Sequence, residues 1–188
     1  MDTVAVLGHE YLPRVIDSVL NEALETAGAV VVEGPRACGK TMTAMHAASS
    51  YALLDDEATA AIAEISPVSI LEGTAPRLLD EWQLNSGLWN LVRRKVDAAS
   101  QPGLFILTGS AVPADDATRH TGAGRFLRIR ERTMTWAEKA DPSDDEGVSI
   151  RELFAGEVPP ADLTAVLDYP EVVERLAQPG FPALAKLP

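Results

Sequence analysis

Hydrophobic and polar positions near the N-terminus repeat with the period of an α-helix. Leucine, valine, isoleucine and alanine side chains within residues 10–27 recur at the spacing i, i+3, i+4, i+7 and i+8, which is typical of an amphipathic helix. Pro13 falls in the first turn, where its missing N–H does no harm, and Gly28 follows the last turn. We therefore predict a helix over residues 10–27.

The chain after this helix alternates between short segments that predict β-strands and longer segments with a helical pattern. The strands are expected at residues 29–33, 51–55, 77–81, 104–108 and 125–130. The helices between them are expected at residues 41–48, 57–65 and 88–99. The continuous apolar run at 104–108 is typical of a strand that is covered on both faces. Strands that alternate with helices at this spacing predict an α/β sandwich with a mostly parallel sheet.

The sequence changes character after residue 140. Residues 141–147 are acidic and rich in turn formers, which predicts a surface loop, whereas residues 149–155 and 169–176 have helical patterns. This stretch is too short to form a second domain by itself. We predict a main domain over residues 1–140 and an acidic loop with a helical extension over residues 141–188.

The composition is that of an ordinary globular protein. Of the 188 residues, 46% are hydrophobic and 23% are charged, which suits one domain with a substantial core. No apolar run approaches the roughly 18 residues of a membrane span, and the N-terminus lacks the pattern of a secretory signal. The single cysteine is typical of a reducing compartment, so we expect a cytoplasmic protein. The formal net charge of −12 disfavours nucleic-acid binding by the whole surface and leaves a local basic patch open.

The clearest chemical motif lies between the first predicted strand and the helix that follows it. The pattern G-x-x-x-x-G-K-[ST] is matched without a gap by Gly34, Pro35, Arg36, Ala37, Cys38, Gly39, Lys40 and Thr41. In such a loop, backbone N–H groups and a helix N-terminus bind phosphate. The lysine reaches the β- and γ-phosphates, and the hydroxyl binds Mg²⁺. We therefore predict a nucleoside triphosphate site with Lys40 on phosphate and Thr41 on the metal.

Two adjacent carboxylates end the third predicted strand. Asp80 and Glu81 follow the apolar pair Leu78-Leu79. We expect Asp80 to hold the Mg²⁺ shell and Glu81 to orient or polarise an attacking water. The alternative is a polar strand end on the surface, but the phosphate loop earlier in the chain favours the functional interpretation.

Hydroxyl groups end the fourth predicted strand. In P-loop ATPases whose fourth strand lies between the first and the third, a polar residue at this point contacts the γ-phosphate or the water. Thr108 is the first candidate for this contact and Ser110 is the second. A hydroxyl that only caps the turn into the next segment is an equally open alternative.

Several of these segments together resemble a known family: Tyr11-Leu12-Pro13-Arg14, the phosphate loop, Leu78-Leu79-Asp80-Glu81-Trp82-Gln83, Leu107-Thr108-Gly109-Ser110 and Gly124-Arg125-Phe126. From about residue 10 to residue 140 the chain resembles the predicted AAA-superfamily ATPases of bacteria and archaea that carry an uncharacterised C-terminal domain. A weaker similarity lies at Gly180-Phe181-Pro182. The resemblance implies a P-loop NTPase three-layer sandwich with a five-stranded sheet in the order 5-1-4-3-2. It also implies an ATPase domain over residues 1–140, with the sequence stopping before a second domain.

The resemblance further implies an arginine that acts on the transferring phosphate. Arg125 is the candidate arginine finger or γ-phosphate sensor, and Arg119 is the second candidate. A neighbouring subunit often supplies such an arginine, so a homo-oligomer with a shared active site is a candidate assembly. The alternative is an arginine that merely leads an exposed strand.

The function that we expect is that of a Mg²⁺-dependent ATPase whose hydrolysis drives a conformational or assembly step. ATP is implied by the resemblance, and the sequence lacks the Asn/Thr-Lys-x-Asp signature by which many GTPases select guanine. Two alternatives stay open. One is a P-loop kinase in which residues 119–132 form an arginine-rich lid, and the other is a nucleotide-gated binding module with little intrinsic hydrolysis. The sequence does not indicate the protein client.

Overall fold

The computed structural model describes residues 6, 8, 10–109, 124–139, 150–157 and 168–184. Contacts within the chain divide it into two compact units, Met1–Thr133 and Met134–Pro188. The first unit contains the sheet and the predicted phosphate loop. The predicted domain limits of 1–140 and 141–188 stay a prediction.

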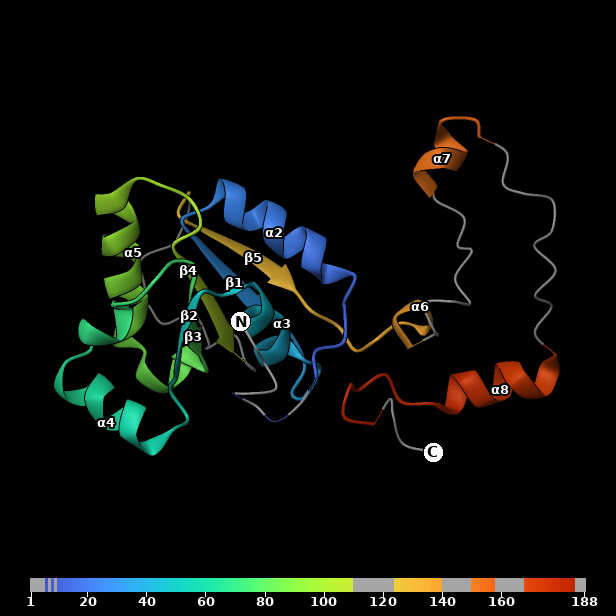
Figure 1. Ribbon diagram of the computed structural model, residues 1–188, viewed down its shortest axis with the longest axis horizontal. Coiled ribbons are helices and arrows are strands. Elements are labelled where there is room, and N and C mark those ends of the chain that lie inside the picture. Colours follow the sequence, from blue (N-terminus) through green and yellow to red (C-terminus); the bar gives the residue numbers. More distant parts are fainter. Residues whose placement is uncertain are drawn as a thin grey trace. The chain divides into compact units, whose positions relative to one another are not determined.

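The first unit is built on a parallel five-stranded sheet (Figure 1). Its strands are β1 (Ala29–Glu33), β2 (Ser50–Leu53), β3 (Arg77–Asp80), β4 (Phe105–Gly109) and β5 (Phe126–Arg130). They lie in the order β2-β3-β4-β1-β5, which confirms the predicted order. Because all five strands are parallel, the residues that follow β1, β3 and β4 emerge at the same edge of the sheet.

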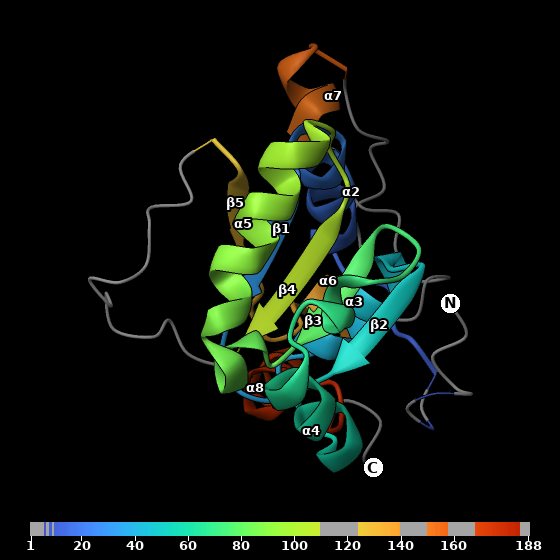
Figure 2. The same cartoon turned by 90° about the vertical axis from the view of Figure 1, so that its left-hand side faces the viewer.

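Helices cover both faces of the sheet and make three layers (Figure 2). Helices α2 (Ile16–Thr26) and α3 (Lys40–Ala47) pack on one face. The other face carries α4 (Glu57–Ile65), α5 (Gly87–Ala99) and the short 3₁₀ turns η1 (Ser69–Leu71) and η2 (Trp82–Asn85). This arrangement confirms the predicted α/β sandwich.

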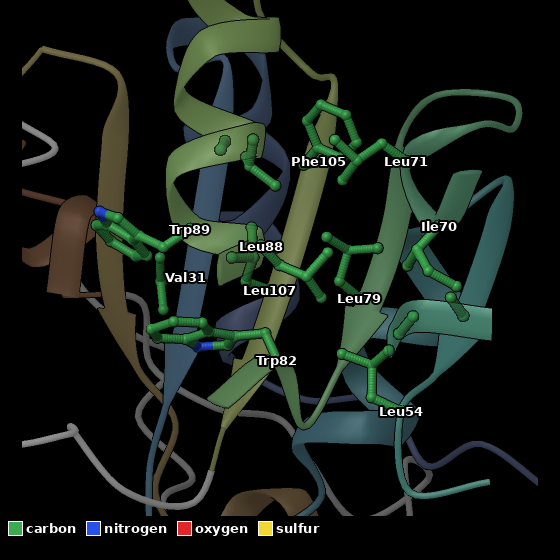
Figure 3. Packing of buried hydrophobic residues seen from close by; sticks show 14 of the residues in the cluster. Val31, Leu54, Ile70, Leu71, Leu79, Trp82, Leu88, Trp89, Phe105 and Leu107 are labelled. Atoms are coloured by element: carbon green, nitrogen blue, oxygen red, sulfur yellow. The ribbon is translucent and has the colours of Figure 1, made fainter. Parts of the chain in front are cut away.

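The central strand β1 supplies buried side chains to both layers of the core. Val30 and Val32 join the cluster under α2 and α3, whereas Val31 joins the cluster under α5. The second cluster includes Trp82 and Trp89, whose side chains lie beside Val31 in Figure 3. Alternating burial on two faces explains why β1 is a continuous β-branched run, and it fixes the position of the loop that follows Glu33.

Helix α2 begins at Ile16, so the predicted start at Glu10 is wrong. The side chain of Asp17 accepts hydrogen bonds from the Arg14 backbone N–H, at 2.8 Å, and from the Tyr11 hydroxyl. These bonds hold the preceding residues in an irregular segment. Apolar spacing alone did not reveal this local competition between side chain and backbone.

The second unit contains three short helices in its described residues: α6 (Trp136–Lys139), α7 (Ile150–Phe154) and α8 (Tyr169–Ala177). The last two confirm the helices predicted at 149–155 and 169–176. Helix α8 begins with a capping box, in which Asp168 and Glu171 satisfy each other's backbone N–H groups. In the part of the chain that the structure describes, no helix is long and apolar enough to cross a membrane.

Candidate functional site

The phosphate-loop motif connects the carboxyl end of β1 to the first turn of α3. Gly39 caps α3 with a φ of 119°, in the left-handed region that favours glycine. Ala37 also has a positive φ, of 62°, as a loop requires when successive N–H groups curl toward one side. The strand, loop and helix therefore follow in the order that the sequence predicted.

Gly34, the first residue of the motif, lies in close contact with the chain after β5. A Cβ atom added to Gly34 would collide with the carbonyl oxygen of Glu131 and would lie 3.1 Å from Sγ of Cys38. Cys38 is buried, and this burial raises the pKa of its thiol. The phosphate loop thus packs against the residues that follow β5, in addition to having a curled backbone.

Lys40 presents a buried ammonium group over the loop. Its Nζ donates to the carbonyl oxygens of Gly34, at 3.1 Å, and Pro35, at 2.8 Å, while the residue is only 6% exposed. Among the described residues it forms no ion pair with a carboxylate. A buried cation without a counter-ion is costly, so this loop is electrostatically suited to an anion.

Thr41, Asp80 and Thr108 meet at the edge of the sheet where β3 and β4 end. Thr41 Oγ1 donates to the carboxylate of Asp80, at 3.0 Å from Oδ1 and 3.1 Å from Oδ2. The hydroxyl of Thr108 donates to Oδ1 of the same carboxylate. Burial raises the pKa of Asp80, although both hydroxyl groups lower it. Three residues singled out from the sequence are therefore neighbours in space.

Glu81 lies just beyond β3, where the chain turns sharply. It has a left-handed backbone, with φ 52° and ψ 42°, which is uncommon outside glycine and is concentrated at functional sites. Its carboxylate accepts a hydrogen bond from Nε2 of Gln83. Oε1 of Gln83 is buried without a hydrogen-bond partner in the described part of the chain, and a Cβ at Gly109 would approach it within 2.5 Å.

Gln83 was not predicted as a site residue, although it belongs to a segment that carries the family resemblance. Gln83 lies only two positions after Glu81, to which it is hydrogen-bonded. The sequence pointed to Gln83 only through the resemblance of this segment to the family, and the hydrogen bond itself is seen only in the structure.

Arg125 lies at the opposite end of the sheet from the phosphate loop of the same chain. Its carbonyl oxygen accepts a hydrogen bond from the N–H of Ala29, the first residue of β1, whereas the loop follows the last residue of that strand. The five residues of β1 span roughly 16 Å. Nε of Arg125 is paired with Asp97 of α5 at 2.6 Å. Arg125 is thus not brought to the other site residues within one chain, and a role in a neighbouring subunit stays a prediction.

The other candidates for these roles, Ser110 and Arg119, lie outside the described residues. The predicted fifth strand is β5, which begins at Phe126 and pairs with β1 along its whole length.

A buried ion pair behind the phosphate loop was also not predicted. Arg14 Nη1 lies 2.7 Å from Oε1 of Glu131 and 2.8 Å from the carbonyl oxygen of Cys38. Oε1 of Glu131 also accepts from the hydroxyl of Thr43 on α3, at 3.1 Å. Arg14 and Glu131 are 117 positions apart, so no local pattern in the sequence could connect them.

The residues at this edge fit a nucleoside triphosphate with Mg²⁺. The loop offers phosphate its backbone N–H groups and the ammonium group of Lys40, for which the described residues supply no carboxylate partner. Thr41 and Asp80 offer the hard oxygen donors that Mg²⁺ prefers, and few protein ligands are needed because phosphates and waters complete its shell. The described residues include no cluster of three or more histidine, cysteine or acidic side chains that would hold a metal without a nucleotide.

Comparison with known protein families identifies a match over most of the first unit. Residues 26–139 match the family model described as AAA domain. The matched region includes the phosphate loop, Asp80, Glu81, Thr108 and Arg125. No curated protein matches the sequence.

Proposed function

Because the chain belongs to the AAA domain family, we propose that it binds ATP together with Mg²⁺ and hydrolyses the nucleotide. The family supports a nucleotide-binding domain of the ATPase type, which we assign to residues 1–140. Hydrolysis would be coupled to a conformational or assembly step. The observation that carries the proposal is the meeting of Thr41, Asp80 and Thr108 beside the phosphate loop.

Each residue of the site has a distinct role in this proposal. Lys40 and the loop N–H groups hold the phosphates, and Thr41 and Asp80 hold the metal. When bound, Mg²⁺ supplies positive charge that offsets the negative charge of the phosphate oxygens. Glu81 orients the attacking water and accepts its proton. Thr108, whose hydroxyl donates to Asp80, contacts the γ-phosphate or the attacking water.

Replacement of Asp80 with asparagine tests the proposal. The amide oxygen of asparagine can still accept from Thr41 and Thr108, so we expect the fold to persist. The negative charge that holds the metal is lost. Phosphate release from ATP in the presence of Mg²⁺ should therefore fall at least about 100-fold, the scale on which losses of transition-state electrostatics are measured.

Asp97→Asn is unsuitable as a control because Asp97 pairs with Arg125, so Glu72→Asn, at an exposed carboxylate paired with Lys95, serves instead. It should hydrolyse ATP at the wild-type rate. Wild-type protein that binds ATP but releases no phosphate above background would contradict the ATPase assignment. So would Asp80→Asn with an unchanged rate.

A nucleotide-gated binding module is the second candidate function, and the position of Arg125 favours it for an isolated chain. Arg125 is far from the phosphate loop of its own chain, so a monomer lacks this charge at its site.

We expect ATP turnover per chain to rise with protein concentration as subunits associate. We expect this rise to be lost in Arg125→Ala.

Phosphate release measured over a wide range of protein concentration distinguishes these outcomes. Arg94→Ala, which removes an exposed arginine of α5, is the control and should keep the concentration dependence. Turnover per chain that is constant and insensitive to Arg125→Ala would exclude the shared site. Negligible turnover at every concentration, with ATP bound, would favour the binding module.

A further inference from the structure

Arg14 and Glu131 form a buried ion pair beside the phosphate loop, and the proposed hydrolysis uses neither residue directly. Their side chains are 4% and 0% exposed. A buried ion pair adds little net stability, because the cost of desolvation offsets the attraction. The other contacts of the two side chains are therefore more informative than the pair itself.

The guanidinium of Arg14 bridges two backbone carbonyl groups that are far apart in the sequence. Nη1 donates to the carbonyl oxygen of Cys38 and Nη2 to that of Arg132, each at 2.8 Å. The Cys38 carbonyl belongs to the same peptide unit as the N–H of Gly39, within the phosphate loop. Arg132 directly precedes Thr133, the last residue of the first unit. A planar, rigid fork thus connects the loop to the end of that unit.

Glu131 reinforces the same connection from the other side. Its backbone N–H donates to the carbonyl oxygen of Glu33 at 2.7 Å, and its own carbonyl group contacts Cys38 Sγ at 3.9 Å. Its side chain reaches Thr43 of α3. Glu131 therefore contacts the strand before the phosphate loop, the loop itself and the helix after it.

The carboxylate of Glu131 is incompletely satisfied, which is unusual for a buried group. Oε2 has no hydrogen-bond partner among the described residues, although the residue is 1% exposed. Burial raises its pKa to about 7, while Arg14, the Thr43 hydroxyl and Lys40 act in the opposite direction. Lys40 is thus electrostatically linked to the pair. A buried polar atom without a hydrogen-bond partner is rare in a native structure, and a functional role is one explanation for it.

We infer, on the basis of the proposed function, that Arg14 and Glu131 are positioning residues that couple occupancy of the phosphate loop to the backbone at Arg132. Phosphate bound at the Gly39 N–H would polarise the peptide unit whose carbonyl group accepts a hydrogen bond from Arg14. Hydrogen bonds on the two ends of one peptide strengthen each other. Because coupling between sites is reciprocal, the hydrogen bond from Arg14 to the carbonyl oxygen of Arg132 also raises the affinity of the loop for ATP.

Arg14→Lys tests this coupling with little disturbance of charge. Lysine keeps a cation beside Glu131 but lacks the fork that can hold both carbonyl groups. Arg93→Lys is the matched control, because Arg93 forms a partly exposed ion pair with Asp97 on α5, outside the phosphate loop. For each protein, hydrogen–deuterium exchange is measured with and without Mg²⁺ and ATP, together with the Kd for ATP and the turnover at saturating ATP.

In the wild type and in Arg93→Lys, we expect ATP to slow exchange at residues 34–41 and also at residues 131–133. In Arg14→Lys, slowing at 34–41 should persist while slowing at 131–133 disappears. The Kd for ATP should rise about tenfold, within the range typical of coupled sites. Turnover at saturating ATP should change less than the Kd, which a general loss of structure would not produce.

Wild-type protein that binds ATP without any change at 131–133 overturns the coupling, as does Arg14→Lys with that change intact. If Arg14→Lys does not fold, the double variant Arg14→Gln/Glu131→Gln removes both buried charges together and leaves no uncompensated ion. It is expected to lose the change at 131–133. Failure of the proposed function is recognised separately, because the wild type would then show no slowing at 34–41.

Discussion

Lys40→Ala is expected to abolish ATP binding. Lys40 is a buried cation whose described partners are two loop carbonyl groups. It is the one lysine of the loop, so no other ammonium group there can bind phosphate in its place. At an ATP concentration of 100 times its Kd, bound nucleotide should raise the free energy of unfolding of the wild type by about 2.7 kcal/mol. The variant should show no such increase, which thermal unfolding with and without ATP measures.

The stability of Lys40→Ala without nucleotide is part of the same test. Removing the buried ammonium group relieves a desolvation cost but also removes its two hydrogen bonds to the loop carbonyl groups, so the variant should unfold at a temperature similar to that of the wild type. Lys95→Ala, which removes a more exposed lysine from α5, is the control and should keep its response to ATP. A Lys40→Ala protein that binds ATP within about threefold of the wild-type Kd would contradict the role of the loop.

Most of the fold followed from local patterns in the sequence. The loop residues Gly34 to Thr41 fix a strand before them and a helix after them, and β1 and α3 lie at those places. The strand order came from the family resemblance rather than from periodicity, because apolar spacing carries no information on which strands are neighbours. The start of α2 was missed because the Asp17 side chain competes for backbone N–H groups.

For the site, too, local sequence patterns predicted some features, whereas others depend on contacts between residues far apart in the sequence. The proximity of Asp80 and Thr108 could be predicted because each lies at the carboxyl end of a strand, and parallel strands bring these ends to one edge. The contact of Arg14 with Glu131 could not, because only the folded sheet brings the segment before α2 to the residue after β5. Arg125 was assigned from resemblance alone, and the register of β5 with β1 places it at the other edge.

Glu81→Gln is expected to retain ATP and stop turnover. Glutamine has the shape of glutamate, and its amide oxygen can still accept from Gln83, so the turn after β3 should persist. It cannot take a proton from water, and loss of general-base catalysis typically costs 10²–10⁴-fold in rate. We therefore expect the rate of phosphate release at saturating ATP to fall at least about 100-fold, with the Kd for ATP near the wild-type value.

Glu72→Gln is the control for this loss, since it makes the same chemical change at an exposed carboxylate outside the site, and it should keep the wild-type rate. Unchanged hydrolysis in Glu81→Gln would remove Glu81 from the catalytic step and leave the left-handed turn with a structural role. If turnover and ATP binding were lost together, Glu81 would instead act in assembling the site. Only a fall in turnover with ATP still bound identifies Glu81 as the residue that activates water, and it separates Glu81 from Lys40, whose loss removes binding itself.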